Sequence, residues 1–205
     1  MSLGGTASYH DTDHLVPARV RTAVAAAEQL DFMYCVRPEI GTLLAVLAGG
    51  LPAGARVGET GTGTGAGLAW MVEAAGPGVS FVSIEQNPRQ VIAAREVFAD
   101  RPEVEIIEGD SSTIADHGPF DLLVVDGGPG SGKGGDSPID PGAALVPGGT
   151  LTVDDFTPMT SWPPRHNGAI DEPRVHWLDH PDLHSTEIRV APDLAVLVCR
   201  RADPS

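Results

Sequence analysis

One stretch decides the fold of this chain: Arg56-Val57-Gly58-Glu59-Thr60-Gly61-Thr62-Gly63-Thr64-Gly65. It is typical of a β-strand that runs through an acidic residue into a glycine-rich turn, and a helix is expected just after it, from Leu68 to Ala75. Glycines suit a sharp turn against which a ligand can lie, because they lack a Cβ atom and tolerate positive φ. Taken alone, the stretch also fits an ordinary glycine-rich turn between a strand and a helix.

The acidic residue before these glycines narrows the choice of ligand. A loop that binds phosphate groups has little use for a carboxylate at its mouth. Glu59 instead suits a ligand with a cationic or amino end. This favours S-adenosylmethionine (SAM) over a nucleotide phosphate.

Composition sets the outer limits. The chain has 205 residues, 41% of them hydrophobic, which predicts one domain with a full core. Its net charge of -15 argues against nucleic acid as a partner. It has no apolar run of about 18 residues and no secretory signal at Met1–Gly5, so we expect neither a membrane span nor export. Cys35 and Cys199 are far apart and expected to be free and buried, which favours the cytoplasm.

Apolar spacing predicts strands that alternate with helices. Further helices are expected over 16–30, 38–47 and 88–99, strands over 55–60, 79–85, 104–107, 121–126 and 149–154, and a closing hairpin over 184–190 and 195–200. The glycine-rich patch Gly127–Gly135 is expected to be a loop. The predicted fold is α/β: a Rossmann-like, doubly wound, seven-stranded mixed sheet with an antiparallel C-terminal edge hairpin and helices on both faces.

The predicted strand ends are all acidic. In an open parallel sheet, ligands bind beyond the carboxyl ends of the strands. The residues found there are Glu59, Glu85, Asp110, Asp126 and the pair Asp154-Asp155. A single acid after a strand is commonplace as a helix cap. Five acidic ends in succession predict a shared ligand site.

In this order the motifs resemble the class I SAM-dependent methyltransferases, in particular the O-methyltransferase branch that includes the catechol and caffeoyl-CoA O-methyltransferases. The resemblance extends from about Val16 to Arg200, and its pieces are Val57–Gly65, Val82–Pro88, Glu108–Ser111, Phe120–Asp126 and Val146–Asp155. It implies one methyltransferase domain over residues 1–205, with an N-terminal helical cap over about 10–50 and a cofactor-binding core over about 55–200. The implied reaction is methyl transfer to a hydroxyl of a small molecule.

The resemblance also implies roles in SAM binding. The methionine end would be held by Glu59 and by the loop residues Gly61, Thr62, Gly63 and Gly65. Glu85 would accept both ribose hydroxyls, and Asp110 with Ser111 would meet the adenine. Gln86 and Asp126 are assigned to the same cofactor site. Glu85 could instead be an acid at a helix entry, and Asp110 a turn residue.

A divalent cation such as Mg²⁺ is implied by the metal-dependent branch of this family. Its ligands would be Asp126, Asp154 and Asp155, and the ion would lower the pKa of the attacking hydroxyl. Asp155 stands where the family pattern has Asn, which alters the charge of the site. The alternative is that Asp126 contacts cofactor or substrate and that the pair caps a loop.

The catalytic candidates are Asp126 and Lys133. Lys133 is the one lysine of the chain, but it lies farther beyond Asp126 than the family pattern places its base, within a glycine-rich insertion. A solvated loop lysine is the alternative, and His166 or His176 could serve instead.

The acceptor pocket would be built by three segments, 9–34, 129–140 and 156–171. The third contains Phe156, Met159 and Trp162, which could wall an aromatic or polyketide-like acceptor. Equally, these side chains could pack a loop or form a homodimer contact.

Two other enzyme classes compete. Gly127–Gly134 fits the GxxxxGK phosphate loop of nucleotide kinases, but Gly134 replaces the usual Ser or Thr and the following residues are poor helix formers. Gly61-x-Gly63-x-x-Ala66 satisfies a permissive dinucleotide fingerprint of NAD-dependent oxidoreductases, although Glu59 is out of character there. A binding module without activity is a third alternative.

Overall fold

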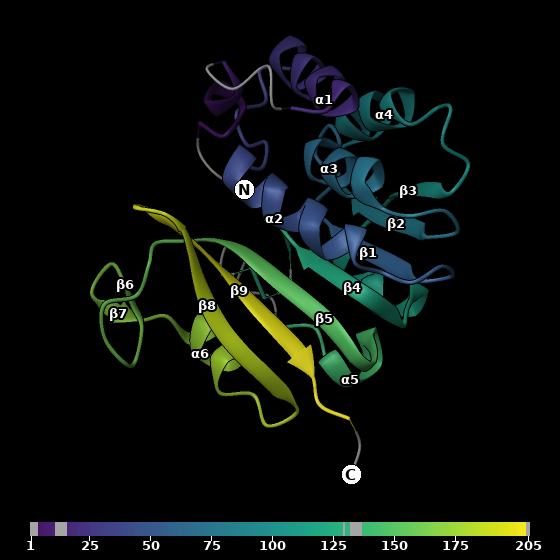
Figure 1. The fold of residues 1–205 in the computed structure, drawn as a ribbon. Coiled ribbons are helices and arrows are strands. Elements are labelled where there is room, and N and C mark those ends of the chain that lie inside the picture. Colours follow the sequence, from purple (N-terminus) through teal and green to yellow (C-terminus); the bar gives the residue numbers. More distant parts are fainter. Residues whose placement is uncertain (1–3, 11–15, 129, 132–136, 204–205) are drawn as a thin grey trace.

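The computed structural model describes residues 4–10, 16–128, 130–131 and 137–203 (Figure 1). Its main sheet is built from β1 (Arg56–Thr60), β2 (Ser80–Glu85), β3 (Val104–Glu108), β4 (Phe120–Val125), β5 (Leu145–Phe156), β8 (Leu183–Ala191) and β9 (Leu194–Arg201). The strand order is β3-β2-β1-β4-β5-β9-β8. The first five strands pair in parallel, whereas β9 and β8 run antiparallel at one edge. The predicted seven-stranded mixed sheet with a C-terminal edge hairpin is therefore confirmed.

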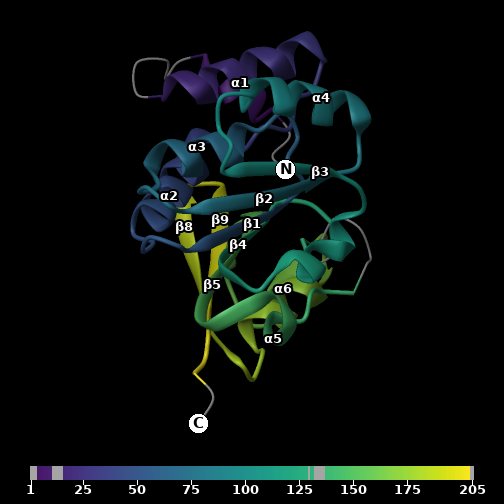
Figure 2. The ribbon, with the colours of Figure 1, turned by 90° about the vertical axis from the view of Figure 1, so that its right-hand side faces the viewer.

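Helices cover both faces of this sheet (Figure 2). They are η1 (Thr6–Tyr9), α1 (Ala18–Gln29), α2 (Pro38–Gly49), α3 (Ala66–Ala74), α4 (Pro88–Val97), η3 (Ser111–His117), α5 (Pro141–Ala144) and α6 (Glu172–Leu178). One hydrophobic cluster joins α1–α4 to the sheet, with Val20, Leu44 and Leu68 in its centre. A second cluster joins η3, α5 and α6 to the other face through Ile114 and Trp177.

Local sequence accounts for most of these elements. Asn87 caps α4, because its side chain accepts a hydrogen bond from the backbone N–H of Arg89 at 3.0 Å, and Pro88 follows at the first helical position. Strand β4 is apolar and buried along nearly its whole length, as a central parallel strand requires. The described part of the glycine-rich patch, residues 127–128 and 130–131, forms turns and bends, as expected for a loop.

The region after β5 departs from the sequence prediction. It contains the short hairpin β6 (Arg165–His166) and β7 (Ala169–Ile170) and then α6, none of which was predicted. These elements are too short to carry a periodic signal. No helix in the described residues combines the length and apolar character needed to cross a bilayer. Cys35 and Cys199 are free and buried, as predicted.

Candidate active site

The glycine-rich loop between β1 and α3 can be made only with glycines. Gly61, Gly63 and Gly65 have φ angles of +82°, +55° and +94°. A Cβ atom on Gly61 would lie 3.1 Å from the backbone nitrogen of Gly127, and one on Gly65 would lie 2.7 Å from the ring of Phe98. The tips of β1 and β4 therefore meet at close backbone distance, and the Thr60 hydroxyl joins them by donating to the Gly127 carbonyl at 2.6 Å.

Glu85, at the end of β2, fixes this loop. Its Oε2 atom accepts a hydrogen bond from the backbone N–H of Gly63 at 2.9 Å, and its Oε1 atom accepts one from Asn87 at 2.8 Å. The residue is 7% exposed. Each carboxylate oxygen has a second lone pair, so these bonds leave acceptor capacity for ribose hydroxyls.

Glu59 lies behind the loop and does not line a described pocket. The Ser83 hydroxyl donates to Glu59 Oε2 at 2.6 Å, and Thr62 Oγ1 lies 2.5 Å from Ser83 Oγ. Because Ser83 already uses its proton in the bond to Glu59, Thr62 is the donor in the second contact. A Cβ atom on Gly67 would come within 2.9 Å of Glu59 Oε1. Sequence reasoning missed Ser83, although a hydroxyl in an otherwise apolar strand was a usable signal.

Asp126 directly follows β4, and Asp154 lies near the end of β5. Both are in the buried part of the same region. Asp126 is 7% exposed and Asp154 is 3% exposed. The two carboxyls are close enough to interact electrostatically. Burial, and next the charge of Asp154, raise the pKa of Asp126 to about 8. Burial also raises the pKa of Asp154.

The same environment acts on Glu59. Burial raises its pKa well above the ordinary value, and the charges of Asp126, Asp154 and Glu85 raise it further. Three strand tips thus place acidic side chains in one region of low dielectric constant. This arrangement favours a ligand that brings positive charge.

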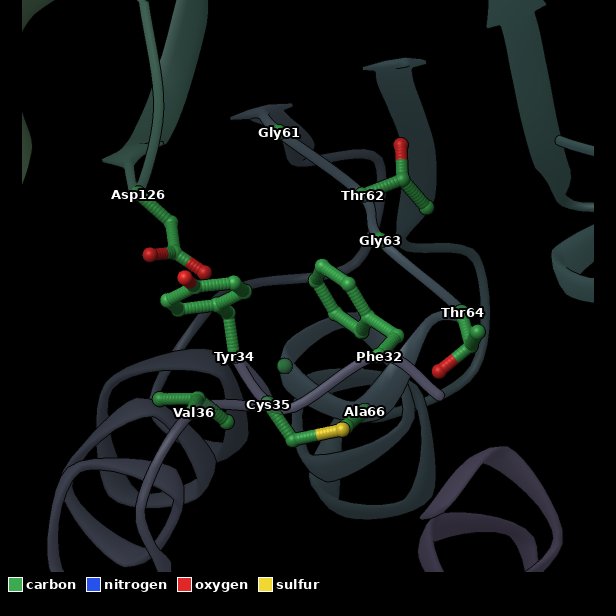
Figure 3. A pocket seen from close by; sticks show the side chains of 11 residues that line it. Phe32, Tyr34, Cys35, Val36, Gly61, Thr62, Gly63, Thr64, Ala66 and Asp126 are labelled. Atoms are coloured by element: carbon green, nitrogen blue, oxygen red, sulfur yellow. The ribbon is translucent and has the colours of Figure 1, made fainter. Parts of the chain in front are cut away.

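A small pocket lies between the glycine loop and the segment Phe32–Val36. Figure 3 shows the ring of Phe32 over Gly63 and the ring of Tyr34 facing the Asp126 carboxylate. The segment is fixed from η1, since Thr6 Oγ1 donates to the Phe32 carbonyl at 2.7 Å and the Tyr9 hydroxyl donates to the Val36 carbonyl at 2.8 Å. The pocket is smaller than a site that encloses a whole drug-sized ligand. It suits one end of a larger molecule.

The residues expected at the adenine lie at the edge of this region. Asp110 is exposed and caps η3 by accepting from the backbone N–H of Ser112 at 2.8 Å, which lowers its pKa. Ser111 lies against the loop after β4, where a Cβ atom on Gly128 would come within 2.0 Å of its hydroxyl. Gln86 is exposed. None of the three lines a described pocket.

Asp155 is half-buried, and in addition to burial its charge helps to raise the pKa of the neighbouring Asp154. Its φ angle is +71°, at an irregularity in the pairing of β5 with β9. It lines a second pocket of about 240 Å³, together with Ser131, His166 and Arg174. His176 packs against Trp177 with ring centroids 4.8 Å apart and lines neither pocket. Lys133 lies outside the described residues.

The expected metal ligands do not form a fitting donor set. Within residues 4–10, 16–128, 130–131 and 137–203, no group of three or more His, Cys, Asp or Glu side chains is arranged to hold a metal ion. Asp126 and Asp154 are in contact, but Asp155 lines the other pocket. Metal binding by these three residues stays a prediction that this arrangement does not support.

The loop after β4 does not have the features of a phosphate loop where it is described. The Trp177 indole N–H donates to the Gly130 carbonyl at 2.8 Å, and Ser131 Oγ donates to the Gly128 carbonyl at 2.8 Å. The next described helix, α5, starts only at Pro141 and has 4 residues. A phosphate loop leads straight into the N-terminus of a helix.

No protein-family model and no curated protein matches this chain. Solved structures share its fold. Cofactor-bound Rv0187 from MTB is 21% identical with a TM-score of 0.75, covering 100% of this chain and 99% of its own. The O-methyltransferase TomG from Streptomyces achromogenes, in complex with SAM, is 21% identical with a TM-score of 0.72 over 98% and 99%. An O-methyltransferase from Bacillus cereus, in complex with SAH, is 18% identical with a TM-score of 0.72 over 97% and 98%. At these identities the likeness establishes the fold.

Proposed function

We propose that this chain is a SAM-dependent methyltransferase that acts on a hydroxyl group of a small molecule. The observation that carries the proposal is the group of buried acids, Glu59, Asp126 and Asp154, beside a glycine loop at the carboxyl ends of parallel strands. Buried carboxylates are costly to ionise unless positive charge is near. SAM has a sulfonium and an ammonium group, so its charge suits this site.

The comparisons support the proposal through the fold. TomG and the Bacillus cereus protein are O-methyltransferases in complex with SAM and SAH, and each matches this chain over nearly its full length. A site at the same end of the same fold would place the donor on the tips of β1, β2 and β4.

The side chains present fit the parts of the cofactor. The loop Gly61–Gly65 and the pocket beneath Phe32 would take the methionine end, Glu85 the ribose, and Asp110 with Ser111 the adenine. When bound, SAM supplies a methyl group on a sulfonium whose sulfur keeps the bonding electrons as carbon passes to the acceptor oxygen. The protein then has to align that oxygen with the methyl group.

The acceptor hydroxyl must also lose its proton. Asp126, which faces Tyr34 across the pocket (Figure 3), is one candidate for a catalytic role, and Lys133 is the other. The mechanism contains no step through a divalent cation, because the described residues form no group of three or more acidic, histidine or cysteine side chains that could hold one.

The competing enzyme classes are not favoured. Kinases and dinucleotide oxidoreductases both bind phosphate groups, and Asp126 and Glu59 would oppose such anions. The loop after β4 is also held against Trp177.

Further expectations concern the domain organisation, the location and the partners of the protein. Residues 1–205 are proposed to act as one domain, which the shared hydrophobic cluster of α1–α4 and the sheet supports. A cytoplasmic location, a homodimer and the absence of nucleic-acid partners remain predictions from composition.

Calorimetric titration with SAM, SAH, ATP and NAD tests the function. We expect SAM and SAH to bind at micromolar concentrations and ATP and NAD to show no heat above dilution. Binding of ATP or NAD without SAM would replace this function by one of the alternatives.

The matched variants are Glu85→Ala and Glu108→Ala. Both acids end neighbouring strands in register, but Glu108 is exposed. We expect Glu85→Ala to lower SAM affinity at least about tenfold and to lower stability by about 1–2 kcal/mol, since two backbone N–H groups lose an acceptor. Glu108→Ala should change neither. Equal affinities in the two variants would contradict the cofactor map.

A further inference from the structure

The donor pocket, between the glycine loop and the segment Phe32–Val36, is covered by side chains of the protein itself. The loop residues Thr62, Gly63, Thr64 and Gly65 are all buried, although the proposed donor has to lie against them. The cavity between the loop and the segment has a volume of about 10 Å³, which is the space of about one water molecule. The methionine end of SAM is larger than that. It can therefore enter only if one wall of the pocket moves.

One wall is a short strap, defined here as residues 32–34. The Phe32 ring covers the glycine loop, since a Cβ atom on Gly63 would meet this ring first, at 3.0 Å. The Tyr34 ring faces the Asp126 carboxylate on the other side of the pocket (Figure 3). The two ring centroids are 5.7 Å apart. Two aromatic rings of the strap thus stand where a donor would meet the loop and the acid.

The strap is held less firmly than the walls opposite to it. Glu85 binds the glycine loop, and the Thr60 hydroxyl joins the tips of β1 and β4. In the strap, by contrast, Met33 is 52% exposed and Tyr34 is 38% exposed, so that both side chains contribute little to the core. The strap begins directly after Asp31, whose φ angle of +53° marks a sharp turn behind α1. A segment with few buried apolar contacts opens locally at a low cost in free energy.

Two hydrogen bonds from one residue of η1, Thr6, tie the strap down. The Thr6 hydroxyl donates to the Phe32 carbonyl at 2.7 Å, and the Thr6 backbone N–H donates to the Met33 carbonyl at 3.4 Å. The same hydroxyl accepts from the backbone N–H of Cys35 at 3.4 Å. Thr6 is buried and does not line the donor pocket. Because a single hydrogen bond makes a modest net contribution to stability, this contact can hold the strap shut and still release it.

We propose that the strap is a gate on the donor pocket, which Thr6 latches shut and which opens when the Phe32 ring withdraws from Gly63. The inference rests on the proposed function and adds how the cofactor is admitted. Thr6 is then a positioning residue that acts through the Phe32 carbonyl. Binding through a gate is slowed in proportion to the fraction of molecules in which the gate is open. A change that unlatches the strap should therefore speed association of the donor.

The rate at which SAH associates with the full chain tests the gate. Tryptophan emission in a stopped-flow instrument follows the association, and rapid filtration with labelled SAM provides a second measurement. Phe32→Ala removes the ring, and Thr6→Val removes the hydroxyl at nearly constant volume. We expect both variants to associate with SAH at least about threefold faster than the wild type.

Two further variants separate the latch from a general loss of packing. Thr6→Ser keeps the hydroxyl and should keep the wild-type association rate. Thr42→Val is the matched control, because the exposed Thr42 hydroxyl donates to the Pro38 carbonyl within its own helix at 2.8 Å and lies outside the donor pocket. It should also keep the wild-type rate. A purely structural role of Thr6 would lower SAH affinity without raising the association rate.

Association of Phe32→Ala that is no faster than that of the wild type would overturn the inference, since the ring would then be a fixed wall. Association of Thr6→Val that is no faster than that of Thr42→Val would overturn the latch. In both cases the wild type still binds SAH, so the proposed function stands. Failure of SAH to bind the wild type and Phe32→Ala alike would overturn both, whereas binding to Phe32→Ala alone would support the gate. If Thr6→Val does not fold, Phe32→Ala decides the question.

Discussion

The two cavities are held together in different ways. The donor pocket depends on backbone: three glycines with positive φ, and the backbone N–H groups of Gly63 and Asn87 that bind Glu85. The second pocket, lined by Asp155, Phe156 and His166, depends on one buried cation, Arg174, which joins α6 to β8 and to the segment after β5. The shape of the donor pocket is thus set by backbone conformation, and that of the second pocket by ionic contacts. A substitution that disrupts one pocket should therefore leave the other intact.

The largest effect is expected from Arg174→Met, which disrupts the second pocket. It leaves Asp171 and Glu187 buried without their cation, and breaking a buried pair in this way costs about 3–5 kcal/mol. Urea denaturation measures the loss. If the donor pocket and the second pocket are independent, the folded fraction should still bind SAH with an affinity within about threefold of the wild type.

Arg165→Met is the control for this change. Arg165 is exposed, and it donates to the Gly168 carbonyl within its own hairpin. Its loss should cost less than about 0.5 kcal/mol, as at an ordinary surface position. Similar losses in the two variants would remove the distinction between the pockets.

Gly61→Ala breaks the donor side. An alanine at this position would have to adopt a φ angle of +82°, which L residues rarely do. Its Cβ atom would also lie 3.1 Å from the backbone nitrogen of Gly127, which cannot rotate away. We expect a loss of about 1–3 kcal/mol in stability and at least a tenfold loss in SAH affinity. Gly76→Ala, where nothing lies within 4 Å, should change neither quantity. Retained SAH affinity in Gly61→Ala would show that the loop tolerates a side chain.

A pH series sharpens the electrostatic side of the comparison. The pKa of Asp126 rises on folding from 3.8 to about 8, so between these values the folded protein holds a proton that the unfolded chain has released. The free energy of unfolding should therefore fall as pH rises from 5 to 8, by at most about 1.4 kcal/mol per unit from this group. Asp126→Asn should flatten the curve. Parallel urea curves for the two proteins would contradict the assignment.

The same pH series predicts the opposite trend for ligand binding. The ammonium group of SAH favours the ionised carboxyl, so SAH affinity should increase from pH 5 to pH 8. In Asp126→Asn this increase should be smaller. An affinity that is independent of pH in the wild type would separate Asp126 from the ligand.

The smallest effect is expected from metal removal. Because the described residues form no group of three or more side chains that could hold a metal ion, turnover with excess EDTA should stay within about twofold of the untreated rate. Added Mg²⁺ should not raise it, and elemental analysis should find no stoichiometric metal. Loss of turnover in EDTA that Mg²⁺ restores would re-establish the three-acid site.

Sequence reasoning succeeded where local pattern governs structure. The parallel strands, the cap at Asn87 and the turn after Glu59 follow from apolar periodicity and from residue types with specific backbone preferences. The elements α6, β6 and β7 escaped it, because they are short and depend on contacts from distant segments, as Arg174 does with Glu187. The positions of the acids at the strand ends could be predicted from the sequence, but the directions in which their side chains point could not.

Asp155 and Asp110 illustrate this limit. The backbone irregularity at the end of β5 gives Asp155 a φ angle of +71° and places it in the second pocket, and no residue type announces such an irregularity. One carboxylate oxygen of Asp110 accepts a hydrogen bond that caps the start of η3, and this helix is too short to predict. Glu59 has the residue type that was expected, yet it is screened from the pocket by Thr62 and Ser83.

The contact between Trp177 and Gly130 has an optical consequence. Trp177 is fully buried, and its indole N–H binds the loop that begins beside Asp126. Trp70, at 7% exposure, binds the Tyr9 hydroxyl that supports the opposite wall of the donor pocket. Once the third tryptophan, Trp162, which is 59% exposed, is replaced by Phe, the chain carries one intrinsic fluorophore on each flank of the proposed ligand site, and their emission reports on the two walls without any added label.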